Sequence, residues 1–358
     1  MKLPHLQLGA LAASIPIIQG GMGIGVSRSK LASAVAREGG IGVISGVQIG
    51  FDEKDFGTNP KEANLRALRK EIRNAKKNSC GGIIGVNLMA AMNNYDEYAK
   101  VCTEEKADLI ISGAGIPMKL PCFVKDTDTK AVPIVSSGRA AAVIIKLWDR
   151  HYSYIPDMVI VEGPEAGGHL GFSEKELEDV NKPDLHDIIK DVKQAIKPYE
   201  NKYDKKISVV AAGGIFTGED VVSFLRGGAD GVQMATRFIA THECDADIRY
   251  KEAYISASKE SIQIIKSPVG MPGRAVRNKF IEDMEKGRKE PVLKCYECLK
   301  NCSPSETPYC ISKALINAVK GNVDEGIIFT GSNGYRIHEI VSVKELINEI
   351  VSEAEKIY

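Results

Sequence analysis

The residues best suited to chemistry lie in one glycine-rich loop. The segment Met158–Ser173 reads MVIVEGPEAGGHLGFS and places His169 shortly after an apolar run. Histidine exchanges protons near neutral pH without a large pKa shift, so it suits general acid or base catalysis. Gly167 and Gly168 leave the space beside the imidazole open. We therefore predict that His169 is the catalytic residue; the alternative is a histidine that only caps or fills the loop.

Other titratable and hydroxyl side chains are weaker candidates. His242, which follows the last apolar run, is the only rival among the other five histidines. Glu162 and Glu165 flank the His169 loop, and we expect Glu162 to support that loop structurally. Whether Ser136 and Ser137 bond a ligand is left open.

A second glycine-rich loop has the features of a phosphate site. In VVAAGGIFTGEDV, residues 209–221, an apolar run ends in Gly213–Gly214 and a helix is expected to begin near Thr217–Gly218. Free backbone N–H groups and the helix dipole would then point at one spot. The next run, GVQMATRF, ends in Ala235–Thr236, whose hydroxyl and amides can complete the cradle. We predict that a phosphate group binds here.

The chain alternates between apolar runs and helical patterns. The runs are continuously hydrophobic, as strands buried on both faces of a parallel sheet are. They are Ile15–Gln19, Ile41–Ser45, Gly82–Asn87, Asp108–Ser112, Val132–Ser136, Met158–Val161, Ile207–Ala211 and Gly231–Met234. The expected helices between them are Ser29–Glu38, Pro60–Lys77, Tyr95–Lys106, Arg139–Asp149, Leu185–Lys197 and Gly218–Arg226.

Eight such units predict an α/β fold, a (β/α)8 TIM barrel spanning residues 1–240. A doubly wound open sheet uses the same elements, but the number and size of the units favour the barrel. The active site of such a barrel lies at the carboxyl ends of the strands, and phosphate commonly binds after strands seven and eight. Both glycine-rich loops fall at that end.

After Phe238 the alternation stops. Residues 241–358 are expected to form a mainly helical appendage, with helices in Glu243–Lys289 joined by the turn SPVGMPGRAV. Further helices are expected at Ile311–Lys320 and Val343–Tyr358. Because no Pro- or Ser-rich linker precedes it, the appendage is either a separate domain or integral to the barrel domain.

Composition limits the classes of partner. The 358 residues are 44% hydrophobic and carry zero formal net charge, which gives no indication of a nucleic-acid partner. No stretch approaches the roughly 20 apolar residues of a membrane helix, and no targeting segment is evident. We expect a cytoplasmic enzyme with a small-molecule substrate and no membrane partner. The sequence is compatible with a homo-oligomer but does not establish one.

Four of the eight cysteines are clustered, at Cys295, Cys298, Cys302 and Cys310. Their spacing matches neither a paired zinc ribbon nor a standard ferredoxin pattern. Three interpretations stay open: a metal site holding an iron–sulfur cluster or zinc, reduced structural thiols, and a redox disulfide.

Several motifs, taken together and in order, resemble the nitronate monooxygenase family. They are PIIQGGMG (16–23), GVNLM (85–89), VEGPEAGGHLG (161–171), VVAAGGI (209–215) and GVQMATRF (231–238). The set equally resembles the flavin-dependent enoyl-acyl carrier protein reductases. A glutamine that the monooxygenases often carry soon after the histidine loop is missing, since the first glutamine after His169 is Gln194.

The resemblance implies an FMN-binding barrel with His169 as its catalytic residue. By the family pattern, the residues that face the flavin, bond it or hold its phosphate are Gly21, Met22, Gly23, Asn87, Gly213, Gly214, Gln233, Met234, Ala235 and Thr236.

Three functions compete at this point. The first is a nitronate monooxygenase that oxidises alkyl nitronates with O2 and uses His169 as acid or base. The second is an NAD(P)H-dependent enoyl-acyl carrier protein reductase, in which the nicotinamide binds transiently because no complete Rossmann fingerprint is present. The third is a noncatalytic flavin- or metabolite-binding sensor with the cysteines as its switch.

Overall fold

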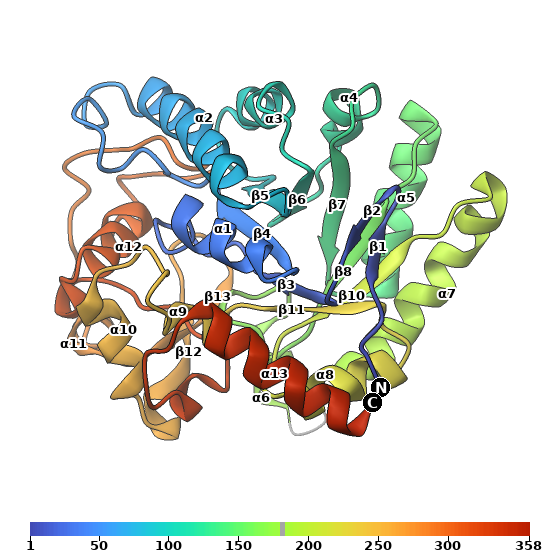
Figure 1. Ribbon diagram of the computed structural model, residues 1–358. Helices are drawn as coiled ribbons and strands as arrows, with labels where there is room; N and C mark the ends of the chain where they lie inside the picture. The colour runs from blue at the N-terminus through green and yellow to red at the C-terminus, as the bar shows by residue number, and fades with distance from the viewer. Residues whose placement is uncertain (180–182) are drawn as a thin grey trace.

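The computed structural model describes residues 1–179 and 183–358. Its centre is a closed barrel of eight parallel strands in the order β10-β11-β3-β4-β5-β6-β7-β8 (Figure 1). The strands are β3 (Ile17–Gln19), β4 (Ile41–Ser45), β5 (Ile83–Met89), β6 (Leu109–Gly113), β7 (Lys130–Val135), β8 (Met158–Glu162), β10 (Ser208–Ala212) and β11 (Gly231–Met234). The predicted barrel and all eight of its strands are confirmed.

Helices pack outside the barrel and connect its strands. The main ones are α1 (Ser29–Arg37), α2 (Pro60–Asn78), α3 (Tyr95–Glu104), α5 (Gly138–Tyr152), α7 (Leu185–Tyr203) and α8 (Gly218–Arg226), with short α4 (Leu120–Val124), α6 (Glu174–Glu178) and α9 (Thr236–Ile239). Their start signals are local. Pro60 occupies the first turn of α2, and Thr217 and Asp220 form a capping box at α8. The six predicted helices are confirmed.

The barrel interior is an apolar core that is closed at one end. Alternate strand residues, among them Ile18, Val43, Met158 and Ile160, form one buried cluster. A hairpin of β1 (Leu6–Leu8) and β2 (Leu11–Ala13) adds Leu6, Leu8 and Ala13 to that cluster. This N-terminal hairpin, which the sequence reading missed, covers the end of the barrel opposite the cavity described below.

The C-terminal segment contains strands as well as helices. Its elements are α10 (Ile248–Ile255), β12 (Ile262–Lys266), β13 (Pro272–Val276), α11 (Lys279–Glu285), α12 (Ile311–Val319) and α13 (Val343–Ile357). The expectation that SPVGMPGRAV is a turn between helices was wrong. It supplies the turn and second strand of an antiparallel hairpin, to which β9 (Gly168–His169) adds a third strand. Helices were rightly expected at 311–320 and 343–358.

The last helix returns to the barrel. α13 packs against α8 and α1, and Ala354 joins Val222 and Leu3 in one apolar cluster. In Figure 1 it crosses the front of the barrel beside α8, and the two ends of the chain lie together. The division of the chain at residue 240 stays a prediction. Within the described residues, no helix is long and apolar enough to cross a membrane.

Candidate active site

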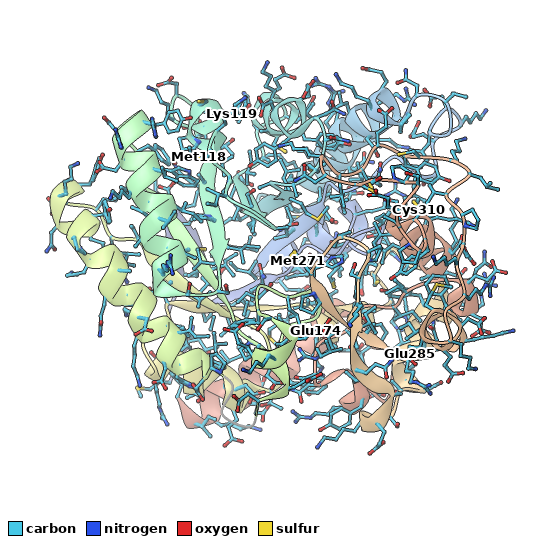
Figure 2. All side chains as sticks on the ribbon, turned by 180° about the vertical axis from the view of Figure 1, so that it is seen from behind. Met118, Lys119, Glu174, Met271, Glu285 and Cys310 are labelled. Carbon is cyan, nitrogen blue, oxygen red and sulfur yellow. The ribbon has the colours of Figure 1, made fainter. Side chains whose placement is uncertain are left out.

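A cavity of about 800 Å³ opens at the carboxyl ends of the barrel strands. Residues that follow all eight strands line it, together with Met271, Ile311 and Phe329 of the C-terminal segment. Figure 2 shows Met271 between Met118, on the barrel side, and Cys310, on the C-terminal segment. The cavity therefore lies where the sequence predicted the active site, but the barrel supplies only part of its wall.

Three polar side chains form the floor of the cavity. Glu162 ends β8 two residues after Ile160, which points into the barrel core, so Glu162 also points inward. By the same alternation Asn87 lies above Gly85 on β5, and Gln233 lies above Gly231 on β11. All three line the cavity. We call Asn87, Glu162 and Gln233 the polar floor.

The polar floor is suited to a ligand with polar edges. The Oε1 atom of Gln233 is buried and has no hydrogen-bond partner among the described residues. The side chains of Asn87 and Glu162 likewise make no hydrogen bond or ion pair to any described residue. Buried polar groups normally have partners, so these atoms fit a bound polar group. The expectation that Glu162 supports its loop was wrong, because its carboxyl contacts the cavity instead.

Gly21 leaves room beside the polar floor, so that a flat ligand could approach Asn87. A Cβ atom on Gly21 would lie 2.4 Å from the Cβ atom of Asn87, which no side chain can tolerate. Gly21, Met22 and Gly23 line the cavity beside Asn87, as the resemblance implied.

The phosphate cradle differs from the expected one in its donors. The amides of Phe216 and Thr217 donate to the carboxylate of Asp220, and the amide of Gly218 donates to Glu353 at 2.8 Å. The first turn of α8 is therefore occupied by carboxylates, and the expectation that it offers free amides was wrong.

The free amide donors lie before α8, directly after β10, and in the loop that follows β11. The amides of Gly213, Gly214, Ile215, Ala235 and Thr236 donate no hydrogen bond to any described residue, and all five residues line the cavity. A set of free N–H groups lining one cavity is suited to an anion, so these five amides are where a phosphate is now expected to bind. Met234, by contrast, packs with its side chain in the outer core, and its carbonyl accepts from the amide of Gly20.

The C-terminal segment reaches the same cradle. The amide of Gly331 donates to Thr236 Oγ1 at 3.1 Å, and Asn333 Nδ2 donates to the carbonyl of Gly214 at 2.7 Å. No motif pointed to either residue. Their sequence, TGSNG, carries a turn signal and nothing more specific.

His169 is held by residues that follow the barrel in sequence. It pairs with Gly273 across the β9–β13 ladder, and its Nε2 lies 2.7 Å from Ser267 Oγ. The ring of Phe329 contacts the imidazole edge to face, with 4.9 Å between centroids. His169 lines the cavity, whereas the rival His242 is exposed and lies outside it.

Burial lowers the pKa of His169 to about 4, because no anion compensates for the lost hydration of the imidazolium. The expectation that this histidine titrates near neutral pH without a large shift is therefore not met. At neutral pH the imidazole is uncharged, and it can both donate and accept a hydrogen bond.

A buried arginine fixes the loop that carries His169. The guanidinium of Arg274 on β13 donates to the carbonyl of Pro164 at 2.8 Å and to that of Ala166. Burial lowers the pKa of Arg274, while Glu165 opposes that shift. Arg274 thus fastens the His169 loop to the C-terminal sheet.

The two serines after β7 have different roles. Ser137 caps α5 by accepting a hydrogen bond from the amide of Ala140, so its oxygen serves the helix. Ser136 lines the cavity, where its hydroxyl donates to the carbonyl of Gly171 at 3.3 Å.

The clustered cysteines lie in a strap, residues 294–310, laid over the loops that follow β4 and β5. Gln48 donates to the carbonyl of Tyr296, and Lys300 donates to that of Ala90. Cys298 and Cys302 line the cavity, Cys295 is exposed, and Cys310 precedes α12.

The structure does not support a metal site in this strap. Among the described residues, no group of three or more His, Cys, Asp or Glu side chains is placed to hold a metal ion. All four thiols are free, and burial raises the pKa of Cys298 to about 11. The strap is held by hydrogen bonds to the barrel loops, which explains its conformation without zinc or an iron–sulfur cluster.

Comparison with known proteins now identifies the family. The nitronate monooxygenase family model matches residues 6–353. The chain belongs to this family. It is therefore a flavin-dependent oxidoreductase, as the motifs implied.

Individual relatives match along nearly the whole chain. A probable nitronate monooxygenase of Staphylococcus saprophyticus is 28% identical over 100% of this chain and 99% of its own. FabK of Thermotoga maritima has a similar structure, with a TM-score of 0.73 and 28% identity over 95% of this chain and 93% of its own. A relative from Mycobacterium tuberculosis is 23% identical over 95% of this chain and 92% of its own. It is named (3aS,4S,5R,7aS)-5-hydroxy-7a-methyl-1-oxo-octahydro-1H-indene-4-carboxyl-CoA dehydrogenase.

Proposed function

We propose that this protein is an FMN-dependent oxidoreductase that oxidises alkyl nitronates with O2. The observation that carries the proposal is that one cavity joins an anion cradle, a polar floor and His169. When bound, FMN supplies the electron-accepting chemistry. The chain's own residues supply the rest.

The cofactor is held by the barrel half of the cavity. The amides of Gly213, Gly214, Ala235 and Thr236 bind the phosphate, and Gly21, Met22 and Gly23 lie against the ring system. Asn87 and the unpartnered oxygen of Gln233 bond its polar edge. Met234 contributes through its backbone, because its side chain faces the outer core.

His169 is the acid–base residue at the reacting group. Its imidazole is uncharged at neutral pH, so it does not form an ion pair with the anionic substrate. Ser267 and Phe329 fix the plane of the ring, so the nitrogen that Ser267 leaves free can face the substrate.

An NAD(P)H-dependent enoyl thioester reductase is the second candidate, and the mouth of the cavity favours it. Ile116 and Val143 line the cavity while 50% and 39% exposed, which gives its opening an apolar surface suited to an acyl chain. The mycobacterial relative is named for a substrate that is a CoA thioester. The noncatalytic sensor is disfavoured by membership of an enzyme family.

An anaerobic stopped-flow experiment separates the candidates. The purified protein is mixed with ethyl nitronate, NADH or NADPH while the flavin absorbance near about 450 nm is followed. We expect bleaching by nitronate and not by either nicotinamide. Bleaching by a nicotinamide alone would establish the reductase instead, and a protein that binds no FMN would refute both.

A further inference from the structure

One short segment of the C-terminal half contacts both the anion cradle and the loop that carries the proposed acid–base residue. We call this segment, residues 329–333, the arm. The amide of Gly331 donates to Thr236 Oγ1 at 3.1 Å, and Asn333 Nδ2 donates to the carbonyl of Gly214 at 2.7 Å. Thr236 and Gly214 also offer free amides to the cavity. A phosphate bound there would therefore fix the two groups to which the arm is attached.

The other end of the arm packs against His169 and its loop. The ring of Phe329 contacts the imidazole edge to face, with 4.9 Å between centroids. Gly167 lies directly on the arm, because a Cβ atom there would come within 2.4 Å of the carbonyl carbon of Thr330. Contacts this close do not allow one side to shift while the other stays in place. The position of the arm therefore sets the position of the imidazole.

A buried tyrosine fastens the Phe329 end of the arm. Tyr254, on α10, is fully buried, and its hydroxyl donates to the carbonyl of Phe329. Tyr254 lies outside the cavity wall, so it does not touch a ligand in the cavity. Its influence on the chemistry can pass only through the arm, which makes it the natural place to loosen the arm without altering the site.

We propose, on the basis of the function proposed above, that the arm couples the anion cradle to His169. A phosphate in the cradle holds the arm, and the arm holds the imidazole in its working orientation. Tyr254 is a positioning residue of the arm. The phosphate of the cofactor then does more than anchor the flavin: a flavin without a phosphate would occupy the same cavity while His169 is held less firmly.

Nuclear magnetic resonance of the imidazole tests the coupling without any turnover. The full-length protein is isotope-labelled at its histidines, and the His169 resonance is identified by its loss from His169→Ala. Riboflavin and FMN are the probes, because they carry the same ring system and differ in the phosphate. We expect the His169 resonance to differ between the two complexes, and inorganic phosphate added to the riboflavin complex should move it toward the FMN position. If riboflavin binds too weakly, inorganic phosphate added to the flavin-free chain should shift the same resonance.

Tyr254→Phe keeps the ring and removes the hydroxyl that holds the arm. In the FMN complex, its His169 resonance should lie near the riboflavin position of the wild type. We expect kcat with ethyl nitronate to fall about 2- to 12-fold, as for the loss of one neutral hydrogen bond, while flavin absorbance shows that FMN is still bound. Tyr154→Phe is the matched control and should change neither property. It removes a tyrosine hydroxyl 3.1 Å from Asp157, which precedes β8 at the end of the barrel opposite the cavity.

Asn333→Ala loosens the cradle end of the arm and keeps the test decisive if Tyr254→Phe does not fold. It should reduce the difference in the His169 resonance between the riboflavin and FMN complexes. Identical resonances in the two wild-type complexes, or wild-type behaviour of the folded variants, would refute the coupling and leave the proposed function intact. If the resonances behave as expected but the FMN complex oxidises no nitronate, the proposed function fails and the coupling stands.

Discussion

The two halves of the cavity wall are built differently. The barrel half consists of strand ends and short glycine loops, and its polar floor lines the cavity with unpartnered atoms. The C-terminal half consists of a small antiparallel sheet and loops that hold His169 through Ser267, Phe329 and Arg274. We therefore expect the barrel half to bind the cofactor and the C-terminal half to position His169. Substitutions should therefore separate cofactor content from turnover.

The largest expected effect concerns the residue that joins the two halves. His169→Ala should keep its flavin, because the cradle and floor are untouched, and should lose turnover by about 100- to 10,000-fold. Flavin content is read from absorbance after gel filtration, and turnover from O2 consumption with ethyl nitronate. Unchanged turnover would remove His169 from the chemistry.

A substitution in the barrel half should instead weaken flavin binding and leave turnover largely unchanged. Gly21→Ala forces a Cβ atom to within 2.4 Å of Asn87, and such overpacking costs about 1–3 kcal/mol. We expect FMN to bind about 5- to 150-fold more weakly, while enzyme saturated with FMN keeps most of its turnover. Fluorescence titration of the apoprotein measures the affinity. Gly57→Ala, whose new atom meets the flexible end of Lys294, is the control and should bind normally.

The hydrogen bond to His169 should have a smaller effect. Ser267→Ala removes a partner at 2.7 Å, and a neutral hydrogen bond contributes about 0.5–1.5 kcal/mol. We expect kcat/KM to fall about 2- to 12-fold with FMN affinity unchanged. Ser261→Ala, at an exposed hydroxyl of the same segment, should have no effect. A loss of flavin from Ser267→Ala would contradict the division between the halves.

The smallest expected effect concerns how fast a thiol reagent alkylates the cysteines of the strap. Cys302 lines the cavity and Cys295 does not, although both side chains are exposed. Bound FMN should therefore slow alkylation of Cys302 by iodoacetamide a few-fold and leave Cys295 unchanged, as read by peptide mass spectrometry. Cys298 should react slowly in either state, because burial raises its pKa. Equal protection of Cys295 and Cys302 would mean that the whole strap moves on binding.

The same division explains what the sequence could predict. Strands such as Ile41–Ser45 are local apolar runs, so they could be predicted from the sequence, whereas Asn87 and Gln233 were named by the family resemblance. The contacts of His169 could not be predicted, because Ser267 and Phe329 lie 98 and 160 positions away in the chain. Their segments carry turn signals that suit many folds.

Two errors have the same cause. The amides at the start of α8 looked free in the sequence, but Glu353 reaches Gly218 from a helix 135 positions away. Glu162 was expected to support its loop because it flanks that loop in the sequence, whereas in space it ends β8 and its side chain lines the cavity. In both cases a tertiary neighbour, invisible in the local pattern, decided the role of the group.

The closure of the helical layer by α13 has a consequence for biosynthesis. The ribosome completes all eight barrel strands by residue 234, about 100 residues before Gly331 and the helix at Val343–Ile357 emerge. Until they do, the nascent barrel lacks the helix that packs against α1 and α8 and lacks the contacts of Gly331 and Asn333 to its anion cradle. The helical layer around the barrel and the second layer of contacts to the cradle are therefore completed only after the barrel strands have been made.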